Sequence, residues 1–252
     1  MNLFSHLIFR FYIFIHERSF IAHKNSFKYM LQKVRCGRER VSIVVFSAYN
    51  KQRAGYNYIK TLRSIKSDKL FIKDNFGPNG LGSYYLGPGK ENTIERGTLE
   101  LIEYVKQKRK SSKIIFVGSS KGGYAALNFF LSFKTINSVA IVGAPQYLLA
   151  SHLLHEGFEQ MLQYILGKID DCSINELDKY VQAKIANYNL SGRLYLQYSR
   201  HEEFYQSQIN PLINDLKSSL VSCYFEERPY SLHSEVHKYF PSFLIQVIKK
   251  EI

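Results

Sequence analysis

A serine between glycines is the residue of this sequence best suited to chemistry. Ser120 lies in the segment Gly118–Gly123 (GSSKGG), after an apolar run and before a helical pattern. This is the G-x-S-x-G pattern of a nucleophilic serine on a sharp strand-to-helix turn, where glycines leave the room that a Cβ atom would take. The spacing of a phosphate-binding loop is absent. We expect Ser120 to be a nucleophile; the alternatives are Ser119 and a turn that only packs the helix on the strand.

A nucleophilic serine needs a basic partner, and several histidines follow it in the chain. In hydrolase-type sheets the order along the chain is serine, acid, histidine, and the histidine removes the hydroxyl proton. His233 lies in the loop after the last predicted strand and just before a helix, so it is the expected base. His237, one helical turn later, and His201, beside the expected acid, are the alternatives.

The acid that orients the histidine is expected in the loop after the strand at 193–198. That loop contains no aspartate before residue 205, only Glu202 and Glu203. Glu202 follows Ser199 by three residues, the spacing of the turn that usually carries this acid, so it is the expected partner of the base. Glu203 is the alternative acid. The third interpretation is that both glutamates are exposed surface carboxylates without a catalytic role.

Acyl transfer also needs N–H donors for the oxyanion of its tetrahedral intermediate. One is expected from the residue after the nucleophile, the backbone N–H of Lys121. The second is expected from the loop after the early strand at 42–47, from the backbone N–H of Ala48 or Tyr49. No metal is expected, because the cysteines form no C-x-x-C pair.

Buried strands alternate with helical patterns along most of the chain. This alternation predicts βαβ units and one α/β-hydrolase-like domain, a mostly parallel sheet flanked by helices with its site at the carboxyl ends of the strands. The segment 148–189 is too long for a simple connection, so we expect a small helical cap insertion; His152 and His155 within it are expected to be structural. The predicted strands are 42–47, 69–73, 113–117, 138–142, 193–198 and 220–225, and the predicted helices are 56–65, 93–108, 124–133, 211–218 and 236–249.

The composition describes a folded, basic protein. Its 252 residues carry 34 Lys+Arg against 21 Asp+Glu, a net charge of +13. Such a surplus favours an anionic partner, which includes a polysaccharide, a membrane surface or a phosphate-bearing cofactor. Specific nucleic-acid binding is not expected, because no reading motif accompanies the charge. Three cysteines in separate parts of the chain exclude a disulfide scaffold and fit a reducing, cytoplasmic compartment.

The first 25 residues stand apart from this pattern, and their role is open. Leu7–Ile15 is apolar but contains Arg10 and lacks a small-residue cleavage site, so it is a poor signal peptide. No apolar run reaches the length of about 18 residues that a spanning helix needs. The alternatives are an element packed on the core and an amphipathic segment lying on a membrane interface, at the inner face of the membrane.

Several segments together resemble a bacterial enzyme family. They are Val45–Tyr49, Tyr56–Lys60, Gly118–Gly123 and His233 before a helix rich in Tyr and Phe. From about residue 40 to the C-terminus the chain is similar to the α/β-hydrolase-like capsular polysaccharide O-acetyltransferases of the meningococcal type, and more distantly to the accessory Sec system acetyltransferases. The resemblance implies that Ser120 is acetylated from acetyl-CoA and that His233 is the base. The acid of the family is an aspartate, and this chain has Glu202 at the matching place.

The expected function is therefore serine-dependent O-acetyl transfer from acetyl-CoA to a sugar hydroxyl of a bacterial surface polysaccharide, by a ping-pong mechanism. Lys121 or nearby basic residues are the candidates to meet CoA phosphates or an anionic glycan. One alternative is an esterase or thioesterase that uses water as the acceptor. Another is a non-catalytic component of a glycan or secretion complex, which the glutamate in place of aspartate keeps open.

Overall fold

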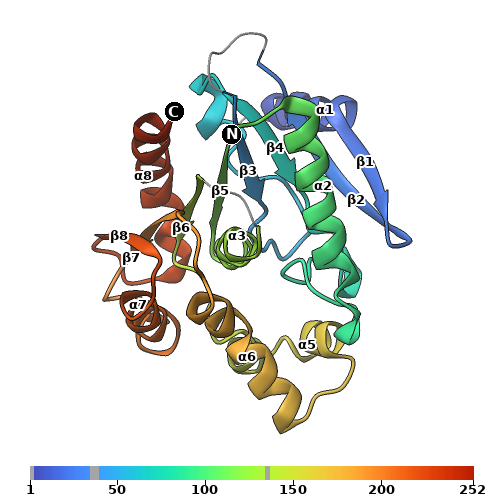
Figure 1. Ribbon diagram of the computed structural model, residues 1–252. Helices are drawn as coiled ribbons and strands as arrows, with labels where there is room; N and C mark the ends of the chain where they lie inside the picture. Colours follow the sequence, from blue (N-terminus) through green and yellow to red (C-terminus); the bar gives the residue numbers. More distant parts are fainter. Residues whose placement is uncertain (1–2, 35–39, 134–136) are drawn as a thin grey trace.

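An eight-stranded sheet organises the molecule (Figure 1). The computed structural model describes residues 3–34, 40–133 and 137–252, and the strand order is β1-β2-β4-β3-β5-β6-β7-β8. The strands from β4 to β8 pair in parallel, so the predicted α/β class with a mostly parallel sheet is confirmed. Their bounds are β1 (Glu17–Ala22), β2 (Asn25–Gln32), β3 (Val41–Phe46), β4 (Asp68–Ile72), β5 (Lys113–Ser119), β6 (Ser138–Gly143), β7 (Arg193–Tyr198) and β8 (Ser222–Glu227).

The edge hairpin β1–β2 is absent from the sequence prediction. β1 pairs antiparallel with β2, where Glu17 lies opposite Met30, and β2 pairs antiparallel with β4, where Tyr29 lies opposite Ile72. Both strands mix charged and apolar residues, and β1 leaves Arg18 exposed at the edge of the sheet. Their extended conformation depends on pairing with the edge of β4, which an apolar pattern alone does not reveal.

Helices cover both faces of the sheet. The predicted helix at 56–65 is wrong: the structure has only the short 3₁₀ turn Thr61–Ser64, because Tyr58 adopts a left-handed φ of 60° that a continuous helix cannot contain. The helices are α1 (Leu3–His16), α2 (Thr93–Arg109), α3 (Lys121–Ser132), α4 (Leu149–His155), α5 (Glu159–Leu166), α6 (Asp171–Ala186), α7 (Asn210–Lys217) and α8 (Val236–Glu251).

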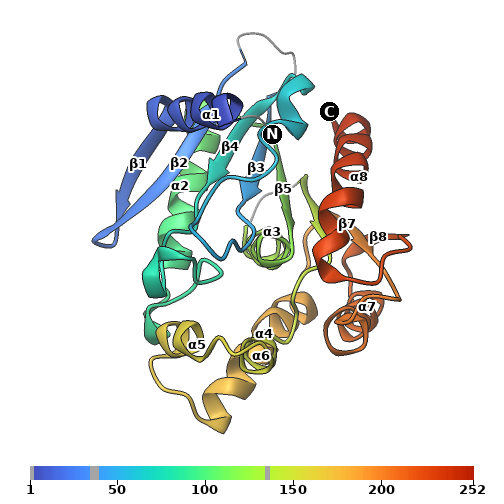
Figure 2. The same ribbon diagram turned by 180° about the vertical axis from the view of Figure 1, so that it is seen from behind.

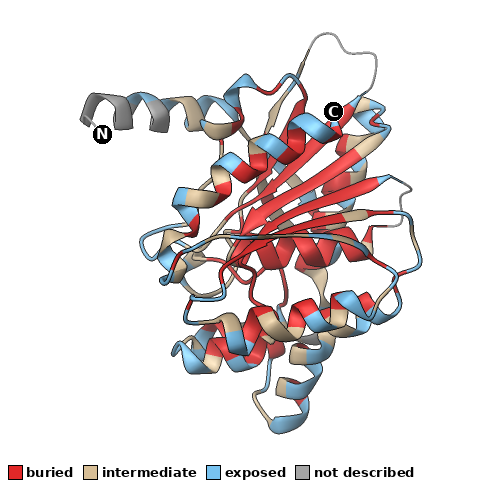
Figure 3. Ribbon diagram, turned by 90° about the vertical axis from the view of Figure 1, so that its left-hand side faces the viewer, coloured by how far each residue is buried: buried red, intermediate tan, exposed pale blue. Residues whose placement is uncertain are grey.

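Two apolar cores lie on opposite faces of the sheet. One packs α2, α3 and the helices from α4 to α7 against it. The other packs α8, the turn at 61–64 and part of α1, and Figure 2 shows α1 and α8 on the near side of the sheet. The central strands β3 and β5 are buried on both faces, which is why they are continuous apolar runs in the sequence (Figure 3).

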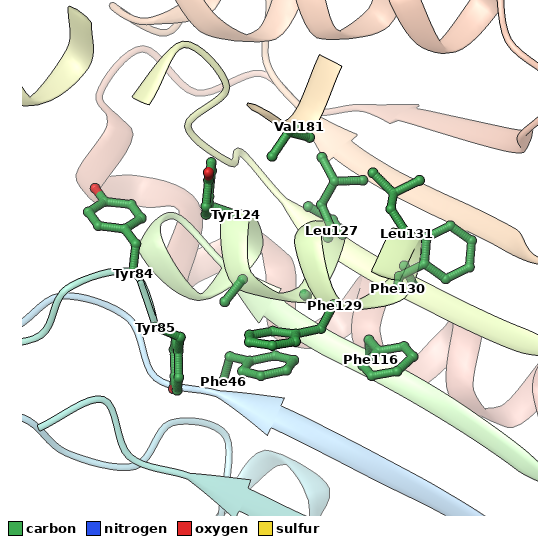
Figure 4. Close-up of a cluster of buried hydrophobic side chains, with 14 of the residues drawn as sticks. Phe46, Tyr84, Tyr85, Phe116, Tyr124, Leu127, Phe129, Phe130, Leu131 and Val181 are labelled. Carbon is green, nitrogen blue, oxygen red and sulfur yellow. The ribbon is translucent and has the colours of Figure 1, made fainter. Parts of the chain in front are cut away.

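Helix α3 is fixed on the sheet by stacked aromatic rings (Figure 4). Phe129 of α3 stacks on Phe46 at the end of β3, with ring centroids 5.0 Å apart, and Tyr85 meets Phe46 edge-on at 5.2 Å. Such pairs add about 0.5–1.5 kcal/mol each beyond the area they bury. They hold α3 against the carboxyl end of β3. Among the described residues, no helix is long and apolar enough to cross a bilayer.

Candidate active site

The turn between β5 and α3 holds Ser120 in a strained conformation. Its φ is 53° and its ψ is −127°, outside the regions that side chains ordinarily favour. A Cβ atom at Gly118 would lie 1.9 Å from the carbonyl oxygen of Gly122, and one at Gly122 would lie 2.8 Å from that of Phe46. The glycines are therefore required by close backbone approach. Strain of this kind is typical of functional sites.

The structure brings Ser120, His233 and Glu202 together from three different loops. His233 Nε2 lies 2.8 Å from Ser120 Oγ, within hydrogen-bond reach. On the other side of the ring, His233 Nδ1 lies 3.4 Å from Glu202 Oε2. The imidazole can therefore take the hydroxyl proton through Nε2 while the carboxylate faces the opposite nitrogen. This is the order of groups in a Ser-His-acid triad.

Glu202 is a buried carboxylate whose charge is directed at the imidazole. Only 4% of the residue is exposed, and neither carboxylate oxygen has a hydrogen-bond donor within the described ranges. The Tyr230 phenol lies beside it; burial first, and the Glu202 charge second, raise the pKa of Tyr230. A buried carboxylate is costly without a counterion, and a protonated imidazole at His233 would supply one. Glu202 is followed by the π-helical turn Tyr205–Ile209, a form common near functional sites.

The alternative residues occupy other positions. Glu203 is exposed, and its carboxylate accepts the backbone N–H of His233 at 3.2 Å rather than facing the ring. His237 uses Nδ1 on the carbonyl of Ser234, and His201 is exposed. Ser119 hydrogen-bonds the hydroxyl of Tyr58. Of the two glutamates, Glu202 is thus the one aligned with the imidazole.

The two expected oxyanion donors differ in the structure. Lys121 is the first residue of α3, so its N–H has no intrahelical acceptor and lies at the positive end of the helix. The N–H of Ala48, however, donates to Asn57 Oδ1 at 2.9 Å. In this structure that N–H is not free to meet an oxyanion, because the amide of Asn57 already accepts it. Tyr49, the other candidate, follows directly in the same loop.

The side chain of Lys121, one of the candidates to meet an anionic ligand, is instead buried in an ion pair. It is 1% exposed, and its ammonium lies 2.6 Å from Asp74 Oδ2, a carboxylate that is itself fully buried. Burial lowers the pKa of Lys121, and the Asp74 charge opposes that shift. Asp74 also accepts the N–H of Ser83 at 2.9 Å. The pair ties α3 to the loop after β4, and that structural role replaces the predicted contact with an anionic ligand.

Gln146 is a polar residue beside the serine that the sequence pattern did not single out. Its Nε2 donates to Ser120 Oγ at 3.3 Å, and the residue is 3% exposed. It follows β6, which is paired with β5 in the centre of the sheet. The one feature of the sequence that could have identified Gln146 as a site residue is its position in the loop after a parallel strand. The serine hydroxyl thus lies between an accepting imidazole and a donating amide.

A cavity of about 580 Å³ adjoins the candidate triad, between α4 and the segment 204–214. Phe204 separates the two: its ring meets that of His233 at 5.4 Å and that of His152 at 5.1 Å, both edge-on. Burial, and next the charge of His233, lower the pKa of His152 to about 4. His152 is therefore a neutral wall of this cavity. Within the described ranges, no group of three or more His, Cys, Asp and Glu side chains is arranged to hold a metal.

The sheet, the strained serine turn and the loops that carry Glu202 and His233 define an α/β-hydrolase fold. No family model matches the sequence, and no curated protein matches it either. Among solved structures the chain is similar to the capsule O-acetyltransferase of Neisseria meningitidis serogroup A. The two share 21% identity over 92% of this chain and 94% of the other, with a TM-score of 0.76. The resemblance expected from the sequence is thus confirmed at the level of the fold.

Two further structures extend the comparison. The Glycosylation Associate Protein (Gap123) complex of Streptococcus agalactiae is 16% identical over 92% of this chain and 46% of the other, with a TM-score of 0.72. The serine hydrolase FphF of Staphylococcus aureus is 15% identical over 93% of this chain and 96% of the other, with a TM-score of 0.66. The same fold therefore occurs in proteins named as acetyltransferases and as hydrolases.

Proposed function

We propose that this protein is a serine O-acetyltransferase that moves an acetyl group from acetyl-CoA to a sugar hydroxyl of a bacterial surface polysaccharide. The observation that carries the proposal is the line of contacts from Ser120 through His233 to the buried Glu202. The meningococcal enzyme, which shares the fold, has been solved as a histidine-to-alanine mutant in complex with CoA. That complex supports acetyl-CoA as the donor, and use of this donor would place the reaction in the cytoplasm.

The first half-reaction forms an acetyl-enzyme. His233 Nε2 takes the proton of Ser120, and Oγ bonds to the thioester carbonyl carbon. The carbonyl oxygen becomes an oxyanion that accepts the N–H of Lys121 and one donor from the loop after β3. The C–S bond then breaks, and the imidazolium returns its proton to the departing thiolate of CoA. Glu202 stabilises the imidazolium throughout, so no charge is left unpaired in the buried site.

The second half-reaction passes the acetyl group to the acceptor. A sugar hydroxyl takes the place of the thiol, loses its proton to His233, and its oxygen bonds to the ester carbon. The bond from that carbon to Ser120 Oγ then breaks, and the imidazolium returns the proton to Ser120 Oγ. The cavity on the other side of Phe204 gives part of the acceptor room, with that one ring between it and the imidazole. The net charge of +13 supports an anionic polysaccharide. The helices α4–α6 act as the cap of this site, since Phe158 between α4 and α5 packs on Tyr49 of the oxyanion loop.

The test is direct detection of the acetyl-enzyme. The protein is incubated with acetyl-CoA without acceptor, quenched in acid and digested, and the peptide containing Ser120 is examined by mass spectrometry. We expect one added acetyl group on Ser120, and none in Ser120→Ala or His233→Ala. Ser119→Ala is the matched control and retains the adduct, because the Ser119 hydroxyl bonds Tyr58 and not the imidazole. Absence of an adduct in the wild-type protein would favour a non-catalytic role.

Hydrolysis is a second candidate, because proteins of this fold include serine hydrolases. A thioesterase would use the same three residues with water as the acceptor. Release of CoA in the presence and absence of a capsule polymer separates the two activities. Release that depends on the polymer supports transfer, whereas equal release without polymer supports hydrolysis.

A further inference from the structure

The described side chains of helix α1 divide into an inward and an outward set. Tyr12 and Ile13 pack on the core that also contains α8, and the Tyr12 hydroxyl accepts a hydrogen bond from Gln32 of β2 at 2.9 Å. The contacts on this inward side fix how the helix lies against the sheet. Its other side meets solvent.

The outward side of α1 is as apolar as the inward side. Ile8, Phe11 and Ile15, spaced i, i+3 and i+7, are 55%, 65% and 58% exposed, and Phe14 beside them is 82% exposed. Helices that are apolar on all sides are normally buried. Four large apolar side chains on one exposed stripe therefore mark a surface that takes an apolar partner.

Positive charge borders this stripe. Helix α1 contains no Asp or Glu, and the exposed Arg18 follows its end. A cavity of about 480 Å³ lies between α1 and the segment 53–56, and Arg53 and Lys73 line it. Lys73 forms an ion pair with Glu17, the one carboxylate in this lining, so these two charges cancel and Arg53 gives the lining its net positive charge. Glu17 also accepts the Tyr56 hydroxyl at 2.8 Å. The apolar stripe thus has a basic edge.

We propose that α1 is an interfacial anchor that binds the protein to an anionic lipid bilayer. With 14 residues the helix is about 21 Å long, shorter than the hydrocarbon core of about 30 Å, so it lies in the interface instead of crossing it. Exposed aromatic and aliphatic side chains beside basic residues are the features of such helices. A second copy of this chain suits the stripe less well, since the basic edges of two copies would repel each other. The proposal is independent of the chemistry assigned to Ser120.

The absence of tryptophan from the chain allows a direct test. Phe14→Trp places a single indole on the exposed apolar side of α1, and Leu220→Trp places one at a matched control site, 81% exposed between α7 and β8. Fluorescence is recorded with vesicles of phosphatidylcholine alone and of phosphatidylcholine mixed with phosphatidylglycerol. We expect a blue shift, and quenching by lipids brominated in their acyl chains, for the indole at position 14 with mixed vesicles only. Added salt weakens the effect, and the indole at position 220 does not respond.

A second variant tests the same surface without a probe. Phe11→Glu is expected to lower flotation with mixed vesicles about tenfold or more, because a carboxylate replaces an apolar side chain at the interface. Its far-UV circular dichroism and melting temperature remain those of the wild type, since position 11 is exposed. An indole at position 14 that does not respond to mixed vesicles overturns the proposal. A second outcome also overturns it: the indole at position 14 is shielded without lipid because two copies form a dimer, and Phe11→Glu dissociates that dimer. Helix α1 would then be an interface between two copies.

Discussion

Replacing Lys121 by methionine should destabilise the protein strongly, because it leaves the buried Asp74 without its counterion. The two side chains are 1% and 0% exposed and 2.6 Å apart. Removing one partner of such a pair costs about 3–5 kcal/mol. For a chain of this size each kcal/mol lowers the melting temperature by about 2–4 °C. Lys121→Met is therefore expected to melt about 6–20 °C below the wild type.

Urea unfolding and calorimetry measure this cost, with Lys238→Met as the matched control. Lys238 forms an ion pair with Glu235, but its side chain is 57% exposed, so its loss should leave the stability almost unchanged. The double variant Lys121→Met, Asp74→Asn should recover part of the stability, because an amide oxygen still accepts the N–H of Ser83. If Lys121→Met were as stable as Lys238→Met and only raised the KM for acetyl-CoA, Lys121 would contact the donor and the structural role would be refuted.

Three further predictions concern the candidate site. Gly118→Ala should cost about 3 kcal/mol in urea unfolding, the upper end of overpacking costs, because its Cβ would lie 1.9 Å from the Gly122 oxygen. Burial lowers the pKa of His152 from 6.5 to about 4. As the pH falls, His152 is therefore protonated at a higher pH in the unfolded state than in the folded state. About 3 kcal/mol of stability should be lost between those pH values, and His152→Asn should flatten this slope in pH-dependent unfolding. Glu202→Gln should lower kcat for acetyl transfer about 10⁴-fold, whereas Glu202→Asp should retain most of it.

The central strands and the serine turn were predictable because local chemistry determines them. Strands buried on both faces require apolar, β-branched residues at successive positions, and β3 and β5 show such runs. The turn at Ser120 needs glycines before and after it, because backbone atoms approach within the radius of a Cβ. A pattern of a few adjacent residues therefore predicts both features.

Elements that depend on a distant partner were not predictable in this way. The hairpin β1–β2 forms because β4 offers an unpaired edge, and the segment 56–65 avoids a helix at Tyr58. The Ala48 N–H donates a hydrogen bond to Asn57 and is not free to bind an oxyanion. Each outcome depends on residues far along the chain or on a single backbone angle, which hydrophobic periodicity does not report.

The sequence by itself determined that a serine would lie on a tight turn of a parallel α/β sheet, with histidine and carboxylate candidates in later loops. Only the tertiary structure decided which of them meet. Glu202 and Glu203 are adjacent and chemically identical, yet one faces the imidazole of His233 and the other holds its backbone N–H. Likewise, only packing shows that Lys121 is buried against Asp74 while Phe14 is exposed. Side-chain direction and burial arise from contacts between distant segments, so they appear only when the chain is folded.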